Sequence, residues 1–249
     1  MKRIAIAPAV AALPLLLTGC QFDQETLNRA ISAGQQVYTA SQPGGQSREA
    51  LIASGLKEAL SIGSERAATT LSAVGGYAKN PALRLTLPES VQPLAKTLRQ
   101  IGMGSHVDKV EADMNRAAEL AAAKAVPVFR SAVTQMTLAD AVGILKGGDN
   151  AATTYFRGRT ESALRTQFAP IIQGTLQQTG YYDSYRQMLA VYNKLPVADK
   201  PSLDLEQHIL DRSLDGLFTK LADEEALIRR DPAKRTTELL KQVFGGTLP

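Results

Sequence analysis

Apolar residues recur at intervals of three and four along most of this sequence, and glycine and proline residues divide the repeats into segments. This spacing places apolar side chains on one face of a helix, whereas glycine and proline end or interrupt helices. We therefore expect helices over residues 24–40, 50–74, 91–101, 106–125, 128–136, 138–145, 150–179, 182–194, 204–230 and 232–244. The pattern predicts an all-α protein, a single bundle domain of about nine or ten helices.

One segment departs from the helical pattern. Near residues 82–88, Leu83, Leu85 and Leu87 alternate with polar residues, which is typical of a strand. A single run of this kind cannot form a sheet, and prolines stand on both sides of it. We expect a short extended connection that packs against helices.

Four polar residues stand where predicted helices begin: Ser47, Ser105, Thr137 and Asp149. Side chains of these types can accept hydrogen bonds from the free backbone N–H groups of a first helical turn. We predict that each one is an N-cap. Pro170 predicts a bend in the long helix that contains it, because proline lacks the backbone donor.

The first twenty residues are arranged like a removable export signal. Lys2 and Arg3 precede an uncharged, mostly apolar run over residues 4–17. These fourteen residues are fewer than the roughly 20 that a membrane-spanning helix needs. The run ends in Leu17-Thr18-Gly19-Cys20, which resembles the lipobox of bacterial lipoproteins, where the cysteine is acylated and becomes the first residue.

The resemblance implies a division of the chain into a signal peptide at 1–19, a lipidated N-terminus with a first helix and tether at 20–46, and a helical domain at 47–249. Two or more acyl chains anchor a protein stably in a bilayer. Gln21 follows Cys20, where an aspartate would resemble an inner-membrane retention signal. We therefore expect lipidation at Cys20 and a domain at the periplasmic face of the outer membrane.

Charge and cysteine content exclude several classes of function. The chain has 28 Lys and Arg against 24 Asp and Glu, and loss of Lys2 and Arg3 with the signal leaves a net charge of +2. Such a small charge does not predict nucleic-acid binding. Cys20 is the only cysteine, so an acylated chain has no thiol for a disulfide, a thiolate nucleophile or a metal site. We expect no cofactor.

Several blocks of the sequence resemble a family of helical bacterial lipoproteins catalogued as domain of unknown function 4197. They are residues 55–60 (GLKEAL), 114–119 (MNRAAE), 140–147 (DAVGILKG), 151–157 (AATTYFR), 214–218 (LDGLF) and 228–244 (IRRDPAKRTTELLKQVF). The resemblance implies an all-α fold and a lipoprotein. It provides no catalytic residues.

Two polar clusters could bind an anion. The first comprises Arg229, Arg230, Asp231, Arg235 and Thr236, where arginines could surround a phosphate or carboxylate at a helix start. The alternative is a joint between two helices that Arg–carboxylate pairs hold together.

The second cluster comprises Asp149, Tyr155 and Arg157, which follow Gly147-Gly148 at the start of a long predicted helix. A glycine pair before a helix can also bind an anion. The alternative is an ordinary loop and cap.

A weaker metal hypothesis rests on Asp204, His208 and Asp211, which share one helix face with Asp215. The alternative is a solvated face. No nucleophile motif occurs, and we predict no catalytic residue. Three functions stay open: a non-catalytic binding or scaffolding module with an envelope protein or lipid as partner, a domain that binds lipid or a small anionic ligand, and an enzyme of unrecognised type.

Overall fold

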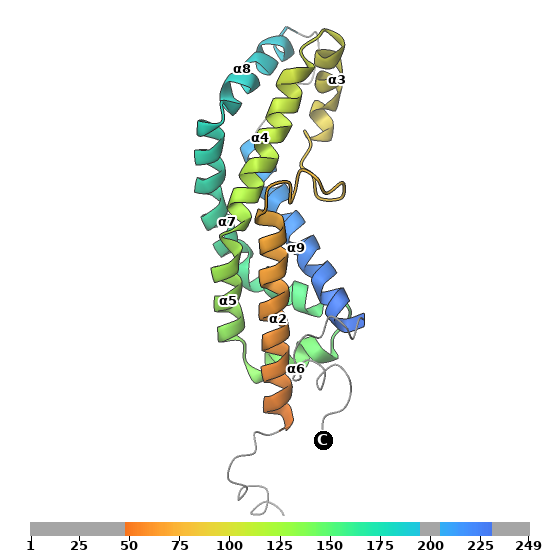
Figure 1. The fold of residues 1–249 in the computed structure, drawn as a ribbon, viewed down its shortest axis with the longest axis vertical. Coiled ribbons are helices and arrows are strands. Elements are labelled where there is room, and N and C mark those ends of the chain that lie inside the picture. The colour runs from red at the N-terminus through yellow and green to blue at the C-terminus, as the bar shows by residue number, and fades with distance from the viewer. Residues whose placement is uncertain (1–47, 195–204, 231–249) are drawn as a thin grey trace, which may run out of the picture. The chain divides into compact units, whose positions relative to one another are not determined.

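The structure is a computed structural model, and it describes residues 48–194 and 205–230. The chain divides into two units, residues 1–45 and 46–249, and all described residues belong to the second unit. Its elements are α2 (Arg48–Ser72), the 3₁₀ turn η1 (Glu89–Val91), α3 (Gln92–Gln100), α4 (Gly104–Ala122), α5 (Ala125–Gln135), α6 (Leu138–Lys146), α7 (Ala151–Gln178), α8 (Tyr181–Tyr192) and α9 (Leu205–Arg230) (Figure 1).

The all-α prediction is confirmed, since residues 48–194 and 205–230 contain helices and no strand. These residues hold fewer helices than the nine or ten that we expected. The helices predicted over 24–40 and 232–244 lie outside the described residues, as do the Ser47 cap and Asp204.

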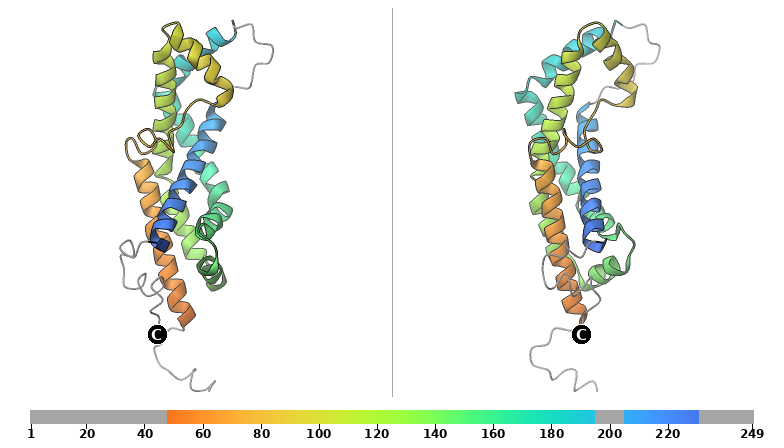
Figure 2. Two further views of the ribbon diagram at one scale, coloured as in Figure 1. Left: turned by 90° about the vertical axis from the view of Figure 1, so that its right-hand side faces the viewer. Right: turned by 45° about the vertical axis from the view of Figure 1, so that its right-hand side comes forward.

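Helix α7 is the longest helix within the described residues and packs against α4, α5, α6, α8 and α9. Helix α5 continues the path of α4, so that both lie along α7 (Figure 1). Helix α2 lies beside α9 in both views of Figure 2 and also contacts α4, α5 and α6. Pro170 lies inside α7, which therefore lacks one backbone hydrogen bond.

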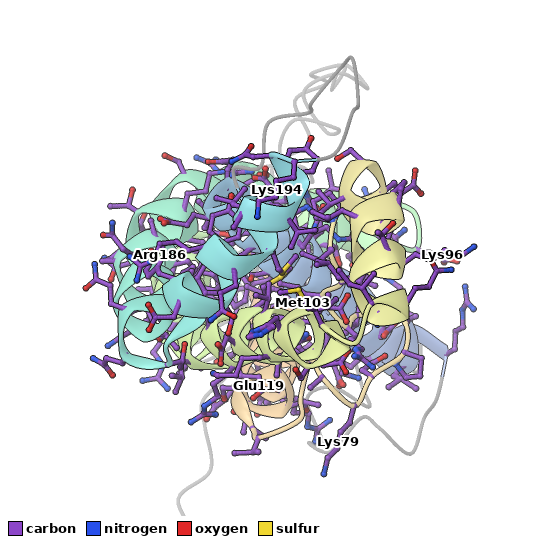
Figure 3. All side chains as sticks on the ribbon, turned by 90° about the horizontal axis from the view of Figure 1, so that it is seen from above. Lys79, Lys96, Met103, Glu119, Arg186 and Lys194 are labelled. Atoms are coloured by element: carbon purple, nitrogen blue, oxygen red, sulfur yellow. The ribbon has the colours of Figure 1, made fainter. Side chains whose placement is uncertain are left out.

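Three phenylalanines join α5, α7 and α9 at the centre of one hydrophobic core. The Phe129 ring lies 5.1 Å from the Phe156 ring and 6.2 Å from the Phe218 ring, both in edge-on geometry. On α4, alanines at 117, 118, 121 and 122 are fully buried. Their small side chains let neighbouring helices approach closely. In Figure 3, Met103 lies among the helices, whereas Lys79 and Lys96 point outward.

The connection between α2 and α3 follows the expected pattern. Leu83, Leu85 and Leu87 are buried, while Arg84 and Thr86 are exposed. Residues 84–88 form neither helix nor strand. The alternation therefore marks an irregular segment with one face on the core.

Two of the predicted caps are wrong, and one is confirmed. Thr137 caps α6 in a reciprocal box with Asp140, in which Thr137 accepts from the Asp140 backbone N–H and Asp140 accepts from that of Thr137. Ser105 lies inside α4, because a tight turn at Gly102 (φ 83°) starts that helix at Gly104. Asp149 does not cap α7, whose N-cap position is Asn150.

Candidate functional site

The start of α7 already holds a carboxylate of the protein itself. Glu225 on α9 accepts hydrogen bonds from the backbone N–H groups of Ala152 and Thr153, at 3.0 and 2.9 Å, and from the Thr153 hydroxyl at 2.9 Å. These first-turn N–H groups are the ones that bind anions at a free helix N-terminus. Because Glu225 satisfies them, α7 needs no local side-chain cap, which explains why the Asp149 prediction fails.

Arg229 completes this buried contact from the next turn of α9. Its Nε and Nη2 donate to one Glu225 oxygen at 3.0 and 2.9 Å, and Nη2 also donates to the Ile144 carbonyl at 3.0 Å. The side chains of Glu225 and Arg229 are 5% and 16% exposed. One ion pair therefore joins the end of α6, the start of α7 and the end of α9. We call these contacts the α6–α7–α9 junction.

The junction brings together the two clusters that the sequence suggested separately. Arg230 on α9 pairs with Asp149 before α7, and both side chains are about 70% exposed. Such an exposed pair contributes little stability, about 0–1 kcal/mol. Among the described members of the clusters, arginines meet carboxylates of the same chain. Asp231, Arg235 and Thr236 lie outside the described residues.

Arg157, from the second cluster, does not reach the junction. It donates to Asp215 on α9 at 3.2 Å through both terminal nitrogens, and its guanidinium lies 4.5 Å from the centre of the Phe218 ring. Farther along α7, Arg165 pairs with Asp211 of α9. The acidic face of α9 is therefore paired with arginines of α7.

The described metal candidates have separate partners. The His208 ring Nε2 lies 2.9 Å from the Thr86 carbonyl, and Asp211 binds Arg165 and Gln207. Partial desolvation acts to raise the pKa of Asp211, but hydrogen bonds from Arg165 and Gln207 hold that pKa below its usual value. Within residues 48–194 and 205–230, no three His, Cys, Asp or Glu side chains are grouped as a metal would require.

Tyr155 lies in a groove between α5 and α7, which we call the α5–α7 groove. Its volume is about 570 Å³, and its lining residues are Lys124, Pro127, Val128, Ser131, Ala132, Gln135, Tyr155, Arg159, Thr160, Ala163 and Gln167. Partial desolvation and the nearby Asp140 raise the pKa of the Tyr155 phenol. By contrast, the apolar hollow beside Arg229 measures about 20 Å³. That is too small for an organic ligand.

Sequence reasoning missed a row of polar residues on α4, Glu111, Asn115 and Glu119, which we call the α4 polar row. All three are buried. Asn115 binds both the N–H and the carbonyl of Leu85, at 2.9 and 2.8 Å, as a neighbouring strand would. The spacing of four residues on an otherwise apolar face was the signal that could have revealed the row.

The other two members of the row also bind backbone groups of the connection. Glu111 accepts from the Leu87 N–H at 3.3 Å, and Glu119 accepts from the Gly75 N–H at 2.9 Å. The α4 polar row thus holds an irregular segment that has no sheet partner. These buried acceptors serve the backbone of the same chain.

Tyr77, in the same connection, is fully buried, and its hydroxyl donates to the Ser213 carbonyl at 2.6 Å. Burial and the nearby Glu119 raise the pKa of this phenol. The ring lies directly over Gly216 of α9, where an added Cβ would be 2.6 Å from Tyr77 Cε1. Gly216 is therefore part of the packing that fixes the connection.

The fold and these contacts define an all-α helical domain whose buried polar groups join its own helices. The chain belongs to the family described as protein of unknown function (DUF4197), which it matches over residues 46–245. No curated protein and no solved structure matches the chain. The sequence blocks that resemble the family include Asn115, Glu119, Thr153, Arg157 and Gly216, so several residues of these blocks make the helix contacts described above.

Proposed function

We propose that this protein is a lipoprotein of the bacterial envelope, anchored by Cys20 to the outer membrane, whose periplasmic helical domain binds or scaffolds without catalysis. The domain would contact an envelope protein or a lipid. The N-terminal pattern supports the proposed location, since Leu17-Thr18-Gly19-Cys20 ends a short apolar run that follows Lys2 and Arg3. No helix of the described residues combines the length and apolar character needed to cross a bilayer.

One observation carries the non-catalytic part of the proposal: the Glu225 carboxylate lies on the α7 N-terminus. That helix start was one of the two helix starts that the sequence suggested for binding an anion such as a phosphate. Its N–H groups and Arg229 are instead engaged by an acid of the same chain. Such a junction stabilises the arrangement of helices, which suits a rigid binding surface better than an active centre.

Replacing Cys20 by serine tests the anchor. We expect the wild-type protein to fractionate with outer membranes and to show an acylated first residue by intact-mass spectrometry. The Cys20→Ser protein should leave the membrane fraction, because the thioether-linked lipid can no longer form. Unchanged membrane association of Cys20→Ser would contradict the proposed anchor.

Photo-crosslinking at positions with exposed apolar side chains tests the binding role. Val74 and Ile101 are 79% and 57% exposed. A photo-crosslinking amino acid at either position should give a discrete protein or lipid adduct in intact cells if the domain acts as a scaffold. The same group at Lys96, a charged exposed position on α3, provides the control. Adducts that are equally diffuse at all three positions would count against a defined partner.

The α5–α7 groove favours a second candidate function, a domain that binds a lipid or small anionic ligand. Its volume of about 570 Å³ lies in the range of ligand-binding clefts. This candidate keeps the same anchor and differs in the bound molecule. The third alternative, an enzyme of unrecognised type, predicts acids that converge in a cleft, and none of the residues that line this groove is acidic.

A further inference from the structure

The α5–α7 groove lies between two helices that pack directly against each other. The Phe129 and Phe156 rings pack edge to face, with centres 5.1 Å apart, between the same two helices. Beside this contact, Ser131, Ala132 and Ala163 line the groove with little bulk. The groove is therefore a property of two well-packed helices.

The charge of the groove has one sign. Lys124 and Arg159 are its only charged lining residues, and both are cations. The nearest carboxylate paired with Arg159 is that of Asp140, at the long distance of 3.9 Å, and the Arg159 side chain is 62% exposed. The guanidinium also lies 5.6 Å from the centre of the Tyr155 ring. Because a guanidinium has five N–H donors, it can bind an anion in addition to these contacts.

The rest of the lining is amphipathic. Pro127, Val128, Ala132 and Ala163 supply apolar surface, and the Tyr155 hydroxyl supplies a donor. A tyrosine hydroxyl with its ordinary pKa of about 10 is already protonated at neutral pH, and partial desolvation raises the pKa of Tyr155 further. An inorganic anion would leave the apolar part of the groove uncovered. A folded protein partner usually contacts about 20–30 residues on each side, and this groove offers eleven.

From this juxtaposition we propose that the α5–α7 groove binds an anionic amphiphile, a molecule with a carboxylate or phosphate headgroup and an acyl chain. The headgroup binds Arg159 or Lys124, and the chain covers Val128, Ala132 and Ala163. This inference rests on the binding role proposed above and gives it a ligand class. It does not depend on the lipid anchor.

The test uses the mature chain, residues 20–249, with Cys20→Ser, so that no detergent competes for the groove. Isothermal titration calorimetry measures the affinity for three probes. Oleate has both an anionic headgroup and an acyl chain, inorganic phosphate has the negative charge without a chain, and monoolein has the chain without a charge. We expect saturable 1:1 binding of oleate, at least tenfold weaker binding of monoolein and no detectable binding of phosphate. Oleate that binds no tighter than monoolein, or phosphate that binds as tightly as oleate, would overturn the ligand class.

Two variants with matched controls locate the site. Ala163→Trp fills the groove, and Ser162→Trp places the same bulk at an exposed neighbour on α7 that does not line it. The double variant Lys124→Glu, Arg159→Glu reverses both charges of the groove. The control, Arg130→Glu, reverses a charge at an exposed position of α5 that does not line the groove. We expect each groove variant to weaken oleate binding at least tenfold and each control to change it less than twofold.

Circular dichroism confirms that each variant is folded before titration. Because the filled and the charge-reversed proteins alter different residues, one of them still decides the question if the other fails to fold. Equal oleate affinity in folded groove variants and controls would overturn the proposed site. Failure here would leave the membrane fractionation of Cys20→Ser unaffected, so the two proposals fail separately.

Discussion

A side chain at position 216 would collide with the ring of Tyr77. The added Cβ would lie 2.6 Å from Tyr77 Cε1, and the ring cannot move away without breaking the hydrogen bond from its hydroxyl to Ser213. Alanine would gain up to about 1 kcal/mol of helix propensity, but overpacking costs about 1–3 kcal/mol. We expect Gly216→Ala to lower the free energy of unfolding in urea.

Gly158 on α7 provides the matched control. An added Cβ there would meet nothing within 4 Å. The same substitution should therefore stabilise the protein by about 0.5–1 kcal/mol, because it restricts the unfolded chain and favours helix. If Gly216→Ala were as stable as Gly158→Ala, the close packing of Tyr77 on α9 would be wrong.

The ion pair between Asp211 and Arg165 gives a second residue-scale prediction. Because hydrogen bonds lower the folded pKa of Asp211 despite partial desolvation, its contribution is present above the unfolded pKa of about 3.9. The contribution is lost as the pH falls through the lower folded pKa. Asp211→Asn should cost about 0.2–1 kcal/mol at pH 7.

Urea unfolding of both proteins from pH 7 to pH 2 tests this dependence. The difference between wild type and Asp211→Asn should shrink steadily below about pH 4. A constant difference down to pH 2 would contradict it. If Mg²⁺ stabilised the wild type and Asp211→Asn abolished the effect, the metal hypothesis would instead gain support.

At the scale of elements, Glu225 is the side chain that joins α6, α7 and α9. Removal of one partner of a buried ion pair costs about 3–5 kcal/mol, because the other charge remains buried. Glu225→Ala should therefore destabilise the protein strongly and increase hydrogen exchange at Ala152 and Thr153, whose N–H groups lose their acceptor. Glu225→Ala with Arg229→Ala should cost less than the sum of the single changes.

Asp149→Ala is the control for this junction. It removes the exposed pair with Arg230, so the free energy of unfolding should fall by less than about 1 kcal/mol. Hydrogen exchange at the start of α7 should not change. If Asp149→Ala exposed these N–H groups as strongly as Glu225→Ala does, the carboxylate on α9 would not be the cap.

Element boundaries were predictable to the extent that their signals are local. The two members of the capping box, Thr137 and Asp140, are three positions apart, so the box is visible in the sequence. The cap of α7 is not visible, because Glu225 lies 72 positions from Thr153. A local candidate, Asp149, was available and was therefore chosen wrongly. Ser105 failed for a related reason, since the turn at Gly102 starts α4 before it.

At the scale of the whole molecule, the all-α class followed from spacing alone, because the period of apolar residues records burial on one face. The partners of polar residues could not be predicted. The sequence suggested Arg157 and Asp215 as members of different clusters, and packing of α7 on α9 pairs them. The groove around Tyr155 also required the structure, since it depends on two helices separated in the chain.

The core predicts how the domain unfolds. The buried side chains of α2 to α9 form one main cluster, and Phe129 joins three of these helices at its centre. A contiguous core of this kind favours a single cooperative transition, although chains of this length can also populate intermediates.

We expect far-UV circular dichroism and tyrosine fluorescence to report the same urea midpoint. Phe129→Ala should lower that midpoint for both probes, at a cost of about 3–5 kcal/mol. Separate midpoints for the two probes in the wild-type protein would mean that parts of the bundle unfold independently, and the core would then not act as one unit.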